Sequence, residues 1–363
     1  AQGSDISTGG CGSRARECDS MAEEETLNIA YAPSAHGDLG AAILARTEGG
    51  HEFESHESST LDEGFKALDD GDADLLLASA IDIRALGGIP SGFSVAGALS
   101  LRDWNHVLVA EDRPDHLPKG AIVLSPSKLQ RRQLRRLRSD CRIRSPKAHS
   151  EIAETPLPNK VAAGDSIAFI NWAESLRESS DIDGYIIPRH QHRIAGLRTR
   201  RHALTAEPKE DSLIRFLPSP HAGLLLLIGR TSFPRSLVLP FIDEEGETAW
   251  AIGEILLNGI DSETHDILGI SVRHRQPGPL LREAERRRDL LTQEALKNTE
   301  GELVDFDVKV EISLELLDRR GKATISMERL ANLDDASQVA RFLVVDWTRL
   351  VRLTCSENDF LDL

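Results

Sequence analysis

The chain has 363 residues, of which 40% are hydrophobic and 4% aromatic, and its formal net charge is −16 at pH 7. This length predicts two or three domains. The acidity excludes general adhesion to DNA or to anionic membranes, because the overall field repels polyphosphate. The sequence contains no run of about eighteen apolar residues, so we expect no membrane-spanning helix.

The N-terminal residues are polar and rich in glycine and serine, and we predict a disordered extension over residues 1–24. They lack the apolar core of a signal peptide. The four cysteines, Cys11, Cys18, Cys141 and Cys355, form neither a CxxC pair nor a zinc-ligand spacing with histidine. We therefore expect a cytoplasmic protein without a metal site.

Strands alternate with helices over the first two thirds of the chain, which predicts parallel α/β sheets. The segment 26–50 is expected to form a strand, a turn at Pro33 and a helix, and a second helix leads into a buried strand at 75–78. Three strands follow at 93–100, 105–112 and 120–127, then a helix from 128 and another at 167–176. The last expected strands of this part are at 184–188, 213–217 and 223–229. The remainder differs in character. A charged helix is expected over 280–300, and an antiparallel hairpin is expected from 304–317 and 321–330.

Positive charge is concentrated in residues 128–147, where nine of the twenty side chains are Lys or Arg. One stripe of a helix would carry Lys128, Arg131, Arg132, Arg135 and Arg136. Such a stripe is either a solvated helix face or the wall of an anion site. Ser125 and Ser127 precede the helix, whose free N–H groups and dipole attract anions.

In open α/β sheets, ligands collect beyond the carboxyl ends of the parallel strands. Three loops occupy such positions: APSAHG after the first strand, SAIDI after the strand at 75–78, and SPSK before the basic helix. Together with the basic stripe, they favour a compact carboxylate or phosphate ligand over a polymer. Nucleic-acid binding is the weakest hypothesis, because no aromatic residues interleave with the charges.

Five segments occur in a recognisable order over residues 26–260: ALDDGDADLLLASAID, IPSGFSVAGALSLRDWNHVLV, LPKGAIVLSPSKLQRRQL, LPSPHAGLLLLIGR and ETAWAIGEILLNG. Their order and spacing resemble the porphobilinogen deaminase (hydroxymethylbilane synthase) family. The resemblance implies an α/β fold of two periplasmic-binding-protein-like (type II) domains with a smaller α+β C-terminal domain. The implied domains are 25–112 with 213–236, 117–212, and a divergent 237–363.

The resemblance also implies a function, which is to join porphobilinogen units into hydroxymethylbilane in tetrapyrrole (haem) biosynthesis with release of ammonia. Asp82 matches the family's catalytic aspartate, and its carboxylate would offset positive charge that develops in the cleft. The residues implied to bind substrate anions are Ser34, Ser79, Ser127, Lys128, Arg131, Arg132 and Lys147.

The chain departs from the family at several positions, with Ala32 and Ile81 where the family has Arg and Lys. The family attaches a dipyrromethane cofactor to a cysteine, but the corresponding stretch, residues 256–270, contains none. No attachment residue is identified, and we do not expect the cofactor. Two alternatives therefore stay open: a transferase with a relocated attachment site, or an inactive relative. The inactive relative would bind a pyrrole or another polycarboxylate in the interdomain cleft, and we expect a monomer with a small anionic ligand.

Overall fold

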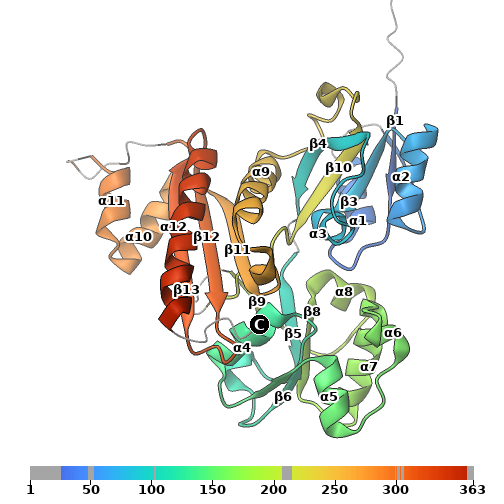
Figure 1. The fold of residues 1–363 in the computed structure, drawn as a ribbon, viewed down its shortest axis with the longest axis vertical. Helices are drawn as coiled ribbons and strands as arrows, with labels where there is room; N and C mark the ends of the chain where they lie inside the picture. Colours follow the sequence, from blue (N-terminus) through green and yellow to red (C-terminus); the bar gives the residue numbers. More distant parts are fainter. Residues whose placement is uncertain are drawn as a thin grey trace, which may run out of the picture.

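The computed structural model describes residues 26–47, 53–101, 104–206, 215–298, 300, 303 and 306–357. Three sheets with their helices form three lobes (Figure 1). The arrangement confirms the predicted α/β fold, with two domains of like mixed sheets and a smaller α+β C-terminal domain. The predicted extension over 1–24, which includes Cys11 and Cys18, lies outside the described residues.

The first domain is a five-stranded sheet in the order β2-β1-β3-β10-β4. Its elements are β1 (Leu27–Tyr31), α1 (Leu39–Thr47), β2 (Phe53–Glu57), α2 (Leu61–Asp70), β3 (Leu75–Ser79), α3 (Ala80–Ala85), β4 (Phe93–Ser100) and β10 (Leu224–Arg230). Strands β1, β2 and β3 are parallel, whereas β10 runs antiparallel to its neighbours β3 and β4. Leu75 and Leu77 enter the apolar cluster on one face of the sheet, and Leu76 and Ala78 enter the cluster on the other. Burial on both faces explains why the strand is apolar from Leu75 to Ala78.

The second domain repeats this plan, with a sheet in the order β7-β6-β8-β5-β9. Its elements are β5 (His106–Ala110), the 3₁₀-helix η1 (Pro114–His116), β6 (Ile122–Leu124), α4 (Lys128–Leu137), β7 (Arg142–Arg144), α5 (Pro146–Ala153), α6 (Asn159–Ala162), α7 (Ser166–Glu178), β8 (Gly184–Pro188), α8 (Arg189–Ile194) and β9 (Arg201–Leu204). The chain crosses from the first domain after β4 and returns after β9. Two connections therefore join the domains.

The C-terminal region folds around the antiparallel sheet β11-β12-β13. Its elements are η2 (Arg235–Leu237), α9 (Glu244–Gly259), η3 (Ser262–Ile267), β11 (Leu268–Arg275), α10 (Pro277–Arg287), α11 (Leu290–Leu296), β12 (Lys309–Leu317), β13 (Thr324–Asn332) and α12 (Ala336–Glu357). The expected hairpin is confirmed as β12 and β13. Helices α9 and α12 share one apolar cluster with this sheet, and Figure 1 shows α9 between it and the first domain.

Two expected elements differ from those observed. Residues 215–217, in the strand predicted at 213–217, form no regular structure, because their backbone bonds go to Thr205 and to the side chain of Gln133 instead of a neighbouring strand. The helix predicted over 280–300 is divided into α10 and α11 at Arg288, which takes the left-handed conformation with φ of 57°. Among the described helices, none combines the length and the apolar character needed to cross a membrane.

Candidate functional site

The basic helix α4 is capped at its N-terminus by Ser127, whose Oγ accepts a hydrogen bond from the Gln130 backbone N–H at 3.3 Å. Leu129 and Leu134 are buried on its apolar side. Arg132 on the predicted basic stripe is also buried. The helix is therefore packed on more than one side, and the interpretation of the stripe as a solvated face is wrong.

One side of α4 is anchored to strand β12 of the C-terminal sheet. Arg136 Nη1 donates to the Glu315 carboxylate at 2.5 Å, and Gln133 Nε2 donates to the same carboxylate at 3.1 Å. Arg132 Nη1 donates to the Leu317 carbonyl oxygen at 2.6 Å. Glu315 lies almost completely out of contact with solvent. These contacts fix the helix between the second domain and the C-terminal sheet.

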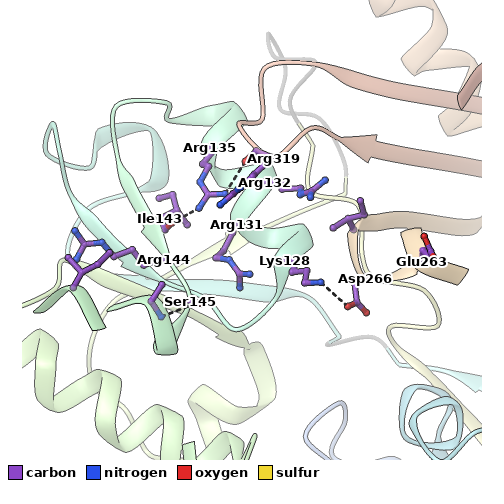
Figure 2. Close-up of a pocket in the computed structure, with 13 residues that line it drawn as sticks. Lys128, Arg131, Arg132, Arg135, Ile143, Arg144, Ser145, Glu263, Asp266 and Arg319 are labelled. Carbon is purple, nitrogen blue, oxygen red and sulfur yellow. Dashed lines mark hydrogen bonds and ion pairs between the residues drawn. The ribbon is translucent and has the colours of Figure 1, made fainter. Parts of the chain in front are cut away.

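Four basic side chains of α4, including Arg132, line a cavity of about 520 Å³, which we call the basic cavity (Figure 2). Its walls come from α4, from β7 and α5 of the same domain, from η3, and from the β12–β13 turn. The lining residues are Lys128, Arg131, Arg132, Arg135, Ile143, Arg144, Ser145, Ala148, Ile152, Glu263, Asp266, Ile267 and Arg319. Six of these side chains are cations and two are carboxylates.

The arginines in this wall are positioned by carbonyl oxygens. Arg131 Nη1 donates to the carbonyls of Ser125 and Pro126 at 2.8 and 2.7 Å. Arg135 donates to the carbonyls of Ile143 and Arg319, at 2.6 and 3.0 Å. Carbonyl oxygens orient a guanidinium group but do not neutralise its charge. The wall therefore keeps a concentrated positive charge.

That charge is strong enough to perturb the arginines themselves. Burial, together with the charges of Arg135 and Arg132, lowers the pKa of Arg131 to about 10. Burial and the charge of Arg319 lower the pKa of Arg135. A bound anion would offset both the desolvation and the mutual repulsion of these groups. The cavity is thus electrostatically suited to a ligand with several negative charges.

The carboxylates lie on the side of the cavity formed by η3. Asp266 Oδ2 is 3.5 Å from Lys128 Nζ, and both side chains are more than half exposed. An exposed ion pair of this kind contributes little to stability. The ammonium group of Lys128 can therefore exchange Asp266 for a ligand anion at small cost.

The predicted catalytic residue Asp82 lies in a different place, in the first turn of α3. Its Oδ2 accepts a hydrogen bond from Ser34 Oγ at 2.5 Å, and its Oδ1 is 3.7 Å from His36 Nε2. The Asp82 charge raises the pKa of His36, but burial lowers it more. Ser79 caps the same helix by accepting from the Ile81 backbone N–H at 3.3 Å. These groups form a compact polar cluster at the strand ends of the first domain.

A smaller cavity of about 250 Å³ lies between the two α/β domains. His36 borders it from the first domain, and Ser127, Ser166 and Gln191 border it from the second. Gln191 Nε2 bridges the domains by donating to the Ala35 carbonyl at 3.1 Å and to Ser166 Oγ at 2.9 Å. This cavity is the cleft expected between the two domains, and its wall lacks the basic stripe.

The predicted site residues therefore fall into separate groups. Lys128, Arg131 and Arg132 meet in the basic cavity, whereas Ser127 faces the smaller one. Ser34, Ser79 and Asp82 gather around α3. Lys147 is exposed on α5 and lines neither cavity.

Sequence reasoning missed several residues of the basic cavity. Arg144 lies on β7, a short loop after α4, and its place in the basic segment 128–147 could have indicated that it belongs to the same site. Arg319 and the carboxylates Glu263 and Asp266 come from the C-terminal region, far along the chain. These three residues reach the cavity only because α4 packs against the C-terminal region in the folded protein.

The described thiols do not suit the attachment of a cofactor in either cavity. Cys141 packs in the core of the second domain, where burial raises its pKa. Cys355 packs against the C-terminal cluster, and its pKa is raised by the same cause. Neither sulfur lines the basic cavity or the smaller cavity.

No family model and no curated protein matches the chain. Similar solved structures include a nutrient-binding protein from Burkholderia cenocepacia bound to methionine, at 15% identity and a TM-score of 0.32, covering 60% of this chain and 91% of that one. The periplasmic aliphatic sulphonate binding protein from Escherichia coli shares 14% identity at a TM-score of 0.30, covering 74% of this chain and 73% of that one. An ABC-transporter periplasmic substrate-binding protein from Coxiella burnetii shares 16% identity at 0.32, covering 62% and 95%. Likenesses this weak assign this chain no ligand and no reaction.

Two expectations from the sequence are corrected by this comparison. No family model and no curated protein matches, and the solved structures similar to this chain include substrate-binding proteins but none of the porphobilinogen deaminase family among those compared, so that family and its role in haem biosynthesis are withdrawn. The physical reason is that the matched motifs describe strand ends and helix starts, such as Leu75–Ser79 and Ser127, which the fold itself requires. The expected cytoplasmic location is withdrawn as well: the similar solved structures include periplasmic proteins and a lipoprotein. Scattered cysteines do not determine a compartment.

Proposed function

We propose that the chain is a binding protein for a small polyanion, such as a polycarboxylate or an organic phosphate, and that the ligand occupies the basic cavity. One observation carries the proposal. Arg131 and Arg135 are partly buried side by side, and carbonyl oxygens hold both in place. Such an arrangement costs free energy in the empty protein and is offset by an anion.

The strength of binding follows from the number of charged contacts. A hydrogen bond between a guanidinium group and a carboxylate contributes about 1.5–3 kcal/mol. Arg131 and Arg135 each retain N–H donors beyond those used on the carbonyl oxygens. Two or three such contacts, after the cost of association, correspond to dissociation constants on the order of micromolar.

A compact ligand is favoured over a nucleic acid by the shape and rim of the cavity. Its volume of about 520 Å³ is typical of small-molecule sites. Glu263 and Asp266 close the η3 side with negative charge, which repels an extended polyphosphate. Isolated phosphate or carboxylate groups can instead sit beside the arginines, away from that side.

Binding rather than turnover is proposed because of the groups that line the basic cavity. Six of the thirteen lining side chains are cations, and backbone carbonyls hold Arg131, Arg132 and Arg135 in place, which is an arrangement for holding charge. The polar cluster of Ser34, His36 and Asp82, which has the groups for proton transfer, borders the interdomain region instead.

Thermal unfolding in the presence of an anion series tests the proposal. Citrate at a hundred times its dissociation constant should stabilise the protein by about 2.7 kcal/mol, whereas acetate at equal ionic strength should have little effect. Arg131→Gln should lose the citrate response, and Arg349→Gln, at an exposed position on α12, should retain it. Equal responses to citrate and acetate, or a full citrate response in Arg131→Gln, would contradict the proposal.

A further inference from the structure

A second large cavity, of about 450 Å³, lies between α3 of the first domain and α9. Its charged and polar lining includes Arg84 from α3 and His221, Trp250, Glu254 and Asn258 from the other side. Unlike the basic cavity, this one carries one cation and one carboxylate. We call it the α3–α9 cavity.

The two opposite charges of this cavity are close but not paired. Within the described residues, no carboxylate forms an ion pair with Arg84, and neither lysine nor arginine forms one with Glu254. Their fields nevertheless interact: burial lowers the pKa of Arg84, and the charges of Glu254 and Asp266 raise it. Separated opposite charges on the wall of one cavity match a ligand that carries both charges.

Each of the two charged groups contacts a histidine. Arg84 contacts His265 Nδ1, while His265 Nε2 lies 3.0 Å from the Ile260 carbonyl. The carbonyl requires a proton on Nε2, which leaves Nδ1 as the acceptor for the guanidinium group. On the other wall, His221 Nε2 is 3.1 Å from Glu254 Oε1. The two histidines thus orient both charged groups.

The backbone of His221 has a conformation that residues other than glycine seldom adopt. Its φ is 61°, in the left-handed region, and its side chain is only 2% exposed. Its ring lies 4.9 Å from that of Trp250. Its Nδ1 is buried without a hydrogen-bond partner in the described part of the chain. Strained residues with unsatisfied buried polar atoms are concentrated at functional sites.

The close approach of α9 to this histidine depends on Gly253. A Cβ at that position would lie 2.9 Å from His221 Cε1, closer than real Cβ contacts allow. The missing side chain leaves room for the imidazole between the turn before β10 and α9. The local backbone is thus arranged around His221 and, through it, around Glu254.

We propose that the α3–α9 cavity is a binding site for a zwitterion of amino-acid size. The ligand carboxylate meets Arg84, the ligand ammonium meets Glu254, and its apolar part lies toward Trp250. The cavity volume is within the range of small-molecule sites. This site is separate from the basic cavity, and its lining selects a ligand of zero net charge.

Calorimetric titration of the full chain with amino acids tests the inference, with L-phenylalanine as the first probe and the other proteinogenic amino acids in turn. We expect saturable binding of at least one of them. For L-phenylalanine, the matched analogues are 3-phenylpropionate, which lacks the ammonium, and 2-phenylethylamine, which lacks the carboxylate. For the zwitterion that binds, analogues lacking either charge should bind at least tenfold more weakly.

Two variants locate the site. Glu254→Gln changes a half-exposed group with little risk to folding, and Arg84→Gln removes the opposite charge. Each should weaken zwitterion binding tenfold or more, while Arg349→Gln should bind as the wild type does. The inference is overturned if no amino acid binds, if single-charge analogues bind as well as the zwitterion, or if Glu254→Gln leaves the affinity unchanged.

Discussion

The anchoring of α4 by Glu315 leads to a quantitative prediction about stability. The carboxylate of Glu315 is 2% exposed and accepts from Arg136 and Gln133. Glu315→Ala leaves the guanidinium of Arg136, itself only 14% exposed, without its counter-charge. Removing one partner of a buried ion pair typically costs about 3–5 kcal/mol. Because Arg136 keeps its bond to the Arg215 carbonyl, we expect the lower end, about 3 kcal/mol.

Urea unfolding is the assay, followed by the intrinsic fluorescence of the four tryptophans, of which Trp347 is buried on α12 in the C-terminal cluster. Glu315→Gln keeps one acceptor oxygen and should cost less than Glu315→Ala. The control is Asp346→Ala, whose ion pair with Arg329 is about half exposed on both sides and should contribute less than about 1 kcal/mol. A Glu315→Ala protein as stable as the Asp346→Ala control would refute the argument that this contact fixes the helix.

Two further predictions concern the cap of α4 and the response to pH. Ser127→Ala removes the side-chain acceptor for the Gln130 N–H and should lower stability by about 1 kcal/mol, measured by the same urea assay, while Ser127→Asp should retain most of it. His190 has its pKa lowered from 6.5 to about 4, mainly by burial, with the charges of His36 and Arg193 lowering it and Asp38 raising it. Between these two values the unfolded chain binds the proton and the folded chain does not, so stability falls as pH drops from 6.5 toward 4 and is recovered above 6.5. His190→Gln should remove on the order of 2 kcal/mol of the stability lost between pH 7 and pH 5, and an unchanged pH profile in this variant would count against the burial argument.

The α/β portion of the fold was predictable because its signals are local. The first four residues of β3, Leu75 to Ala78, are apolar on both faces, as is typical of a strand covered on both sides. Ser127 before the basic helix was a recognisable N-cap, and it has that role in the structure. Hydrophobic periodicity and capping depend on neighbours within a few residues, so the sequence displays them directly.

The hairpin of the C-terminal sheet was predicted, but the burial of its second face was not, because that face is polar. Strand β12 alternates Val310, Ile312 and Leu314 with Glu311 and Glu315, which is the pattern of a half-exposed strand. Every residue of β12 is buried nevertheless. Arginines cover its polar face, with Arg273 and Arg275 on Glu311 and Arg136 on Glu315. These partners cannot be identified from spacing, because they come from other elements.

The same reason limited what the basic stripe could reveal. Helical spacing correctly placed Lys128, Arg131 and Arg132 on one side of α4. It could not show that Arg136 would bond to a carboxylate 179 residues away. It also could not show that Asp266 would face Lys128. A charge pattern identifies a face, but its partner is set by tertiary docking.

Calorimetric titration of citrate into the wild type and Arg131→Gln tests the central claim most directly, at two salt concentrations and with Arg349→Gln as the surface control. We predict one site, weakened by higher salt, with affinity reduced roughly 10- to 100-fold in Arg131→Gln and unchanged in Arg349→Gln. Equal affinity of all three proteins for citrate, or no citrate binding by the wild type, would contradict the assignment of the basic cavity as a polyanion site.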